Sequence, residues 1–253
     1  MTGIEKGVGG PRPPASGPAA PPTHIRPGTA AFLRSNLGLF AAGFGTIALL
    51  YTVQPILPLF SAQFHVSPAG SSLALSLTTL TLAVMMLLVS GLSESFGRKP
   101  VMTACIFASS LLTLLLAAAP SWSDLLILRA LAGITLSGLP AVAMAYVAEE
   151  MEPRAIGLSM GLFVAGTGIG GMAGRLITGV LADFYGWRAA VALVGCLGIA
   201  CGVVFMIVLP PSRHFRPRSL ALHVLLDAYR THLRDPLLRA LFIEGFLLMG
   251  SFV

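Results

Sequence analysis

The chain has 253 residues, of which only 10% are charged, against roughly 25% in ordinary soluble proteins. With a mean hydropathy of +0.85 it has too little polar surface for a soluble domain, so it belongs in a lipid bilayer. The net charge of +6 does not indicate nucleic-acid binding, because the cations lie between apolar runs and form no basic stripe beside aromatic residues. The cysteines, Cys105, Cys196 and Cys201, fall inside apolar runs without metal-ligand or disulfide spacing. We therefore expect no metal and no cofactor.

Residues 1–31 are rich in glycine and proline and predict a disordered cytoplasmic tail. The tail contains no apolar core, so it does not read as a cleavable signal peptide. We expect the first apolar run to act as an uncleaved insertion signal.

Hydropathy predicts an all-α membrane protein, because the apolar runs have about the 20 residues needed to cross a bilayer. A further run starts near Leu237 and reaches Val253, which indicates an incomplete seventh span, either because the chain is a fragment or because the last helix is short. The six predicted spans of the bundle, which occupies residues 32–209, are about 37–60, 71–93, 100–119, 122–147, 156–182 and 189–209.

The basic residues predict the orientation. With the N-terminus inside, all but three of the 16 Lys and Arg residues lie on the cytoplasmic side, as short cytoplasmic loops require. The exceptions are Arg188 outside, and Arg129 and Arg175 within spans. We expect a multi-pass protein of the bacterial plasma membrane with a cytoplasmic N-terminus.

Residues 210–236 form a basic connector with leucines at helical spacing, which predicts an amphipathic helix on the inner membrane surface. A soluble linker helix packed on the bundle is the alternative.

Two loops resemble each other at an offset of 89 residues, measured from Glu94 to Asp183. The first reads Ser90-Gly-Leu-Ser-Glu94-Ser-Phe-Gly97-Arg98-Lys99, and the second ends in Asp183-Phe-Tyr-Gly186-Trp-Arg188. Because three spans separate them, the loops must lie on opposite membrane faces. This predicts two inverted three-helix repeats, as in secondary transporters; chance similarity of two short loops is the alternative.

The first loop resembles the signature of the major facilitator superfamily between its second and third spans. Arg129-Ala-Leu-Ala-Gly133 is similar to the Arg-x-x-x-Gly pattern of that family, and Gly166-Thr-Gly-Ile-Gly170-Gly171 to its antiporter motif. The resemblance covers residues 32–253 and is strongest to bacterial arabinose-efflux and drug/proton antiporter permeases. The chain departs from the family pattern where Ser90 replaces a glycine, Glu94 an aspartate and Thr167 a proline.

The resemblance implies the N-terminal half of a twelve-helix secondary transporter, a monomer when full length, that moves a small-molecule solute by alternating access. Proton-coupled efflux is implied in the same way. The alternatives are a truncated, transport-incompetent half or an uncoupled or uptake carrier. No carboxylate lies deep in the six spans, so a proton carrier is expected at Glu94 or outside them. An enzyme or a channel is disfavoured, because neither paired acids at depth nor a continuous polar face is present.

The first loop is also a candidate gate. Gly97 allows a left-handed turn, and Arg98, next to Lys99, can pair with a carboxylate of the next inner loop. A plain topology anchor is the alternative. The candidate gating partners in that loop are Glu149, Glu150, Glu152 and Arg154.

Gln54, Arg129 and Arg175 are predicted at a similar depth in spans one, four and five, where polar groups normally face a cavity or a partner. We expect them to line the outer half of a substrate cavity. The alternative is that the arginines bind helix carbonyls or extend to lipid headgroups.

Small residues let helices approach closely in lipid, and glycines spaced four apart in span five, including Gly157 and Gly161, predict such contacts. The candidate helix-packing glycines are Gly133, Gly166, Gly170, Gly171 and Gly174.

Overall fold

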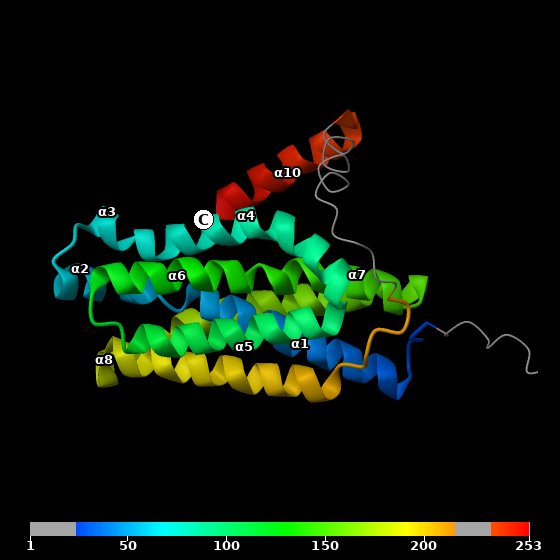
Figure 1. Cartoon of the computed structure of the whole chain (residues 1–253), viewed down its shortest axis with the longest axis horizontal. Coiled ribbons are helices and arrows are strands. Elements are labelled where there is room, and N and C mark those ends of the chain that lie inside the picture. Colours follow the sequence, from blue (N-terminus) through cyan, green and yellow to red (C-terminus); the bar gives the residue numbers. More distant parts are fainter. Residues whose placement is uncertain (1–23, 216–233, 253) are drawn as a thin grey trace, which may run out of the picture.

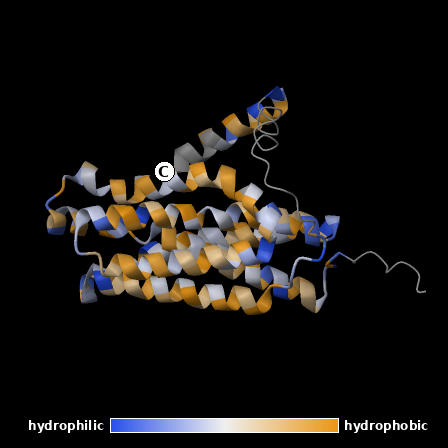
Figure 2. Cartoon of the chain, in the orientation of Figure 1, coloured by the Kyte–Doolittle hydropathy of each residue, from blue (hydrophilic) through white to orange (hydrophobic). Residues whose placement is uncertain are grey.

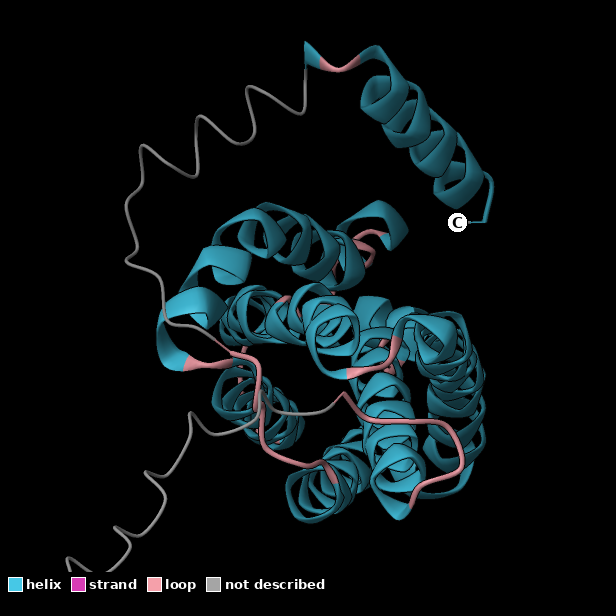
Figure 3. Cartoon of the chain, turned by 90° about the vertical axis from the view of Figure 1, so that its right-hand side faces the viewer, coloured by secondary structure: helices cyan, strands magenta, loops and turns pink. Residues whose placement is uncertain are grey.

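The computed structural model describes residues 24–215 and 234–252. Nearly all of this part is helical, and the helices run side by side as an elongated bundle (Figure 1) that Figure 3 shows end-on. The helices of the bundle are α1 (Ala30–Tyr51), α2 (Leu57–Phe64), α3 (Pro68–Ser71), α4 (Leu73–Phe96), α5 (Arg98–Ala117), α6 (Trp122–Leu136), α7 (Gly138–Glu150) and α8 (Ile156–Val208). Two 3₁₀ turns, η1 (Gln54–Ile56) and η2 (Pro153–Ala155), join them, and α10 (Pro236–Phe252) follows the second gap.

Five helical stretches in the described residues are long and apolar enough to cross a membrane: Ala30–Phe64, Pro68–Val89, Arg98–Ala117, Trp122–Glu150 and Pro153–Val208. Hydrophobic residues fill the long middle parts of the helices, and hydrophilic ones gather toward the two ends of the bundle (Figure 2). The sequence predicts six spans, and the difference lies in the last stretch, where predicted spans five and six are merged.

The merged helix α8 has 53 residues and is interrupted at Gly186, whose backbone (φ 80, ψ 158) is not helical. A straight helix of this length would extend about 80 Å, whereas the hydrocarbon core is ~30 Å thick. The two segments, 156–185 and 187–208, run in opposite directions along α1. Residue numbers in the first segment rise together with those of α1, because Gly166, Gly170 and Gly174 contact Phe40, Phe44 and Ala48 in turn. Residue numbers in the second segment rise as those of α1 fall, because Gly198 contacts Leu49 and Cys201 contacts Gly45.

Prolines interrupt the first span. Helix α1 ends at Tyr51, and η1 and α2 follow with Pro55 and Pro58 in their first turns. Proline supplies no backbone N–H and cannot continue a helix ladder. The last carbonyls of α1 therefore need donors from elsewhere.

Side-chain caps begin α1, α3 and α6. The hydroxyl of Thr29 accepts from Phe32 N at the start of α1, and the hydroxyl of Ser121 accepts from Asp124 N at the start of α6. Such caps satisfy one of the N–H groups that a helix start leaves without a partner. The chain leaves α4 and enters α5 through Gly97, at φ 95 and ψ 151.

Three apolar clusters follow one another along the bundle axis. One contains Tyr146 and Phe205, the middle one contains Leu49 and Val194, and the last contains Phe60. Exposed leucines such as Leu80 and Leu87 cover the outside of α4. This outward-facing apolar surface suits lipid, which has no water to satisfy polar groups.

Residues 24–29, assigned from sequence to the disordered tail, are ordered against the bundle. Ile25 forms an isolated parallel β-bridge with Met151: its N donates to Glu150 O (2.8 Å) and its O accepts from Glu152 N (3.0 Å). This long-range contact has no local sequence signal. The rest of the predicted tail and most of the predicted connector helix lie outside the described residues.

Candidate functional site

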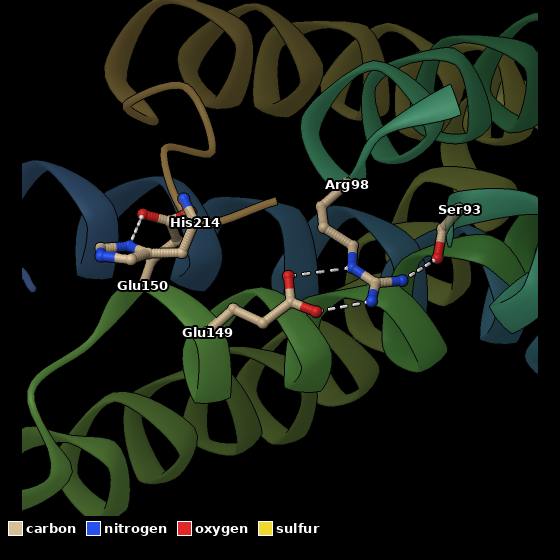
Figure 4. Close-up of polar contacts among 5 residues, drawn as sticks. All are labelled: Ser93, Arg98, Glu149, Glu150 and His214. Carbon is tan, nitrogen blue, oxygen red and sulfur yellow. Dashed lines mark hydrogen bonds and ion pairs between the residues drawn. The ribbon is translucent and has the colours of Figure 1, made fainter. Parts of the chain in front are cut away.

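Arg98 lies at the start of α5 and joins three helices at one end of the bundle, here called the Arg98 end (Figure 4). Its Nε and Nη2 donate to the Glu149 carboxylate on α7 at 3.2 and 2.6 Å, and its Nη1 donates to Ser93 Oγ on α4 at 2.5 Å. The Arg98 side chain is 8% exposed and that of Glu149 31%. Such a two-point contact fixes both distance and orientation, which a single charge pair does not.

The four candidate gating partners, two at the end of α7 and two just after it, have separate roles. Glu149 pairs with Arg98, whereas Glu150 turns to the segment after α8. Glu150 is 1% exposed, and its carboxylate accepts from His214 N (2.8 Å) and lies 3.1 Å from His214 Nδ1 (Figure 4). Glu152 contributes its backbone N to Ile25, and Arg154 is exposed in η2.

The segment that leaves α8 is held by several elements of the Arg98 end. Lys99 Nζ donates to Leu209 O at 2.5 Å, and Tyr146 Oη donates to Pro210 O at 3.1 Å. The His24 ring stacks on the His214 ring with centroids 4.3 Å apart. The N-terminal segment and the exit from α8 therefore form one cap over this end. Sequence reasoning missed this cap, because its partners lie far apart along the chain.

The second loop of the predicted repeat lies at the opposite end. Arg188 Nη2 donates to Ala119 O just after α5 (3.0 Å) and stacks over Trp187. The Trp187 indole donates to Gln63 Oε1 on α2 at 2.5 Å. Asp183 and Gly186 are exposed. Arg98 and Arg188 thus each hold a helix junction, one at either end of the bundle.

The predicted cavity residues form two separate arrangements. Arg175 Nε donates to Gln54 Oε1 at 2.5 Å, and its guanidinium lies 3.9 Å from the centroid of the Tyr51 ring. Arg175 is exposed on the surface of the bundle. Gln54 and Arg175 are therefore brought together by the packing of η1 on α8.

Arg129 is instead inside the bundle, where its exposed fraction is 1%. It donates to Ala74 O (2.9 Å) on α4 and to Leu49 O (3.4 Å) and Leu50 O (2.8 Å) in the last turn of α1. The last carbonyls of a helix have no partner within it. The geometry thus supports the carbonyl-binding alternative for Arg129 and not a place in the cavity lining.

The candidate packing glycines sit where helices touch. A Cβ on Gly166 would lie 2.6 Å from Phe40 O, and one on Gly174 would lie 2.6 Å from Ala48 O. Gly170 meets Phe44 in the same way, Gly171 meets Ile47, and Gly133 meets Thr78 on α4. In contrast, Gly157 and Gly161 have no atom within 4 Å of a built Cβ, so the sequence-based expectation of a helix contact there is wrong for this bundle.

The two remaining residues of the first loop lie on α4. Glu94 is half-buried near the end of α4, where Arg98 pairs with Glu149 instead of with it. Ser90 lies on the same helix, and its side chain is outside the described part of the chain. Sequence reasoning also passed over Glu244, an acid in the middle of α10; a lone carboxylate in an apolar run was the available signal.

Comparison with known proteins identifies the class. The family model described as Major Facilitator Superfamily matches residues 39–253, and the chain belongs to this family. It is 50% identical over 233 residues to the inner membrane transport protein YnfM of Escherichia coli (strain K12), covering 92% of this chain and 56% of that protein. It is 47% identical over 229 residues to an uncharacterized MFS-type transporter, YybF, of Bacillus subtilis (strain 168), covering 90% of this chain and 57% of that protein.

Solved structures show the same fold at low identity. The human organic anion transporter MFSD10 matches with a TM-score of 0.61 and 17% identity over 75% of this chain and 51% of that one. The chain spans about half the length of the curated relatives it matches. With its membrane-length helices, these relatives identify a multi-pass inner-membrane protein.

Proposed function

We propose that the chain makes six membrane crossings and forms one half of a twelve-helix secondary carrier for a small solute. The reversal of α8 at Gly186 supports two crossings within that helix. The relatives, of which this chain covers 56% and 57%, support the half-carrier reading. The two arginine-held junctions at opposite ends support an inverted repeat, on which alternating access depends.

In this proposal the Arg98 end faces the cytoplasm. Arg26, Arg34, Lys99 and Arg154 belong to the same end as Arg98, whereas Arg188 belongs to the other. Lys and Arg accumulate in cytoplasmic loops. Single-cysteine labelling of Ser95 and Tyr185 in intact cells tests the orientation, and equal access of both sites to an impermeant reagent would refute it.

The single observation that carries the proposal is the contact of Arg98 with Glu149 and Ser93. It joins helices from both predicted repeats, α4 and α5 from the first and α7 from the second. We infer that this contact holds the inner loop in the shape that meets the second half of the carrier. Without this contact the bundle would still insert into the membrane, but its inner loop would no longer close against the second half of the carrier.

Transport into proteoliposomes or inverted vesicles tests this inference. Arg98→Gln should abolish solute movement while membrane insertion stays normal, and Arg26→Gln, an exposed arginine of the same end outside the contact, should transport as the unmodified chain does. Normal transport by Arg98→Gln would leave Arg98 a topology anchor only.

We further propose efflux coupled to protons, with Glu94 or Glu244 as the proton carrier. Similarity to a multidrug resistance protein, MdtG of Proteus mirabilis (strain HI4320), at 29% identity over 187 residues, supports the direction. An ionisable residue within an apolar helix supports Glu244. Transport is measured in the same vesicles under imposed pH gradients of either sign. A transport rate that is the same under both gradients would refute proton coupling.

A further inference from the structure

The two arginines inside the predicted spans differ in how their charge is accommodated. Arg129 is buried and donates to three backbone carbonyls. Arg175 is exposed on the bundle, and within the described part of the chain it donates from Nε to Gln54 and from Nη1 to Gly171 O (3.3 Å). No described carboxylate lies within ion-pair distance of Arg175, and its Nη2 has no acceptor among the described residues.

The Arg175 guanidinium is nevertheless held in place. The Tyr51 ring, with its centroid 3.9 Å from Cζ, supports one face, and Gln54 holds the Nε edge at 2.5 Å. A guanidinium fixed in this way loses little further freedom when a ligand binds. Its outer edge is left to form the paired N–H donors that match a carboxylate.

The direction of the side chain argues against an arginine that extends to lipid headgroups. Arg175 lies eight residues before Asp183, about 12 Å from that end of the segment. An arginine extending to headgroups would point toward that nearer end. Its contact with the Gly171 carbonyl, one turn earlier in α8, instead directs the guanidinium deeper along the span. A cation at this depth normally faces a cavity or an anionic partner.

We propose that Arg175, positioned by Gln54 and Tyr51, is the anion-recognition point of the substrate cavity, and that the solutes include small organic carboxylates with an apolar body. The carboxylate binds the free guanidinium edge. The apolar body lies against the exposed side chains beside it, Met172 at 63% and Leu176 at 62% exposure. This inference rests on the proposed transport function, because it assumes that this face of α8 lines the solute pathway.

The test compares three probes of nearly one shape and different charge: benzoate, neutral benzamide and cationic benzamidinium. Binding is measured by calorimetry on the protein in lipid nanodiscs at constant ionic strength. We expect benzoate to bind roughly tenfold or more tighter than benzamide, the range that a charge-assisted hydrogen-bond pair supplies. Benzamidinium should bind most weakly.

Variants separate recognition from folding. Arg175→Gln should remove the preference for benzoate, and Arg175→Lys, which keeps the charge but not the paired donors, should keep part of it. Arg26→Gln, an exposed arginine outside the spans, should bind all three probes as the unmodified chain does. If Arg175→Gln does not fold, the affinities of Arg175→Lys for benzoate and benzamide test the proposal instead. A benzoate preference that is absent, or that is unchanged in the Arg175 variants, overturns the proposal.

A parallel flux measurement distinguishes this failure from failure of the transport proposal. If benzoate binding depends on Arg175 but proteoliposomes show no solute flux, the anion site is supported and the transport proposal is refuted. Flux of a neutral or cationic solute without any benzoate preference would refute the anion site and leave transport standing.

Discussion

Gly97 and Gly186 adopt nearly the same backbone conformation at opposite ends of the bundle, with φ 95 and ψ 151 at Gly97 and φ 80 and ψ 158 at Gly186. Both lie in a region of φ/ψ space that is essentially restricted to glycine. Each precedes a helix whose first turns hold a cation bound to a backbone carbonyl or a carboxylate, Arg98 in one case and Arg188 in the other. The two helix junctions are therefore built in the same way.

Alanine at Gly186 should destabilise the protein although a Cβ there meets no atom within 4 Å. The backbone conformation itself is unfavourable for alanine, by about 1–3 kcal/mol. Thermal unfolding in detergent measures the change. Gly157→Ala, also without a neighbour within 4 Å but without a positive φ, is the matched control and should not lower the melting temperature. Equal effects at both positions would contradict the strain argument.

Gly174→Ala should separate the first segment of α8 from α1. The new Cβ would lie 2.6 Å from Ala48 O and 2.7 Å from Ala48 Cα, and backbone atoms cannot move aside as a side chain can. We expect a loss of about 1–3 kcal/mol from overpacking. Gly168→Ala on the same helix has no atom within 4 Å and should be neutral or stabilising, by up to roughly 1 kcal/mol. A lower melting temperature for Gly168→Ala than for Gly174→Ala would show that α8 and α1 pack differently from this arrangement.

Arg129→Lys should lower stability while solute affinity is retained. Lysine keeps the positive charge, so the cost of inserting a cation is nearly unchanged. It cannot supply the planar donors that reach Ala74, Leu49 and Leu50 together. Buried carbonyls without donors cost about 1–3 kcal/mol each, so a drop in melting temperature is expected. An unchanged melting temperature with weakened solute binding would instead place Arg129 in the substrate cavity.

Arg98 and Glu149 should be energetically coupled. Their two hydrogen bonds are largely shielded from solvent on the Arg98 side, so each single variant leaves the other charge poorly satisfied. Removing one partner of a buried pair costs up to about 3–5 kcal/mol, and the 31% exposure of the Glu149 side chain should reduce this toward the lower end. A double-mutant cycle of Arg98→Gln and Glu149→Gln measures the coupling by chemical denaturation. Additive effects would show that the pair contributes nothing as a unit.

The apolar helices and the turn at Gly97 could be predicted from sequence, because hydropathy and glycine act locally. The division of the fourth predicted span into α6 and α7 at Ser137 was not predicted, because hydropathy alone does not show where a continuous apolar run breaks. The partner of Arg98 was likewise open. Glu149 and Glu150 are adjacent on α7, and successive helical side chains point in directions about 100° apart. Only the packing of α7 beside α5 turns Glu149 to Arg98 and Glu150 to His214.

The amino-acid sequence by itself determined that the chain enters a membrane and at which end its cations gather, because these follow from the solvation of each residue and its neighbours. The tertiary structure alone decided what each intramembrane arginine contacts. Arg129 meets the carbonyls that the break in α1 leaves without donors, and Arg175 meets Tyr51 and Gln54 with part of its guanidinium still available. The two residues are chemically identical, so their difference arises only from the long-range packing of α6 and α8 around α1.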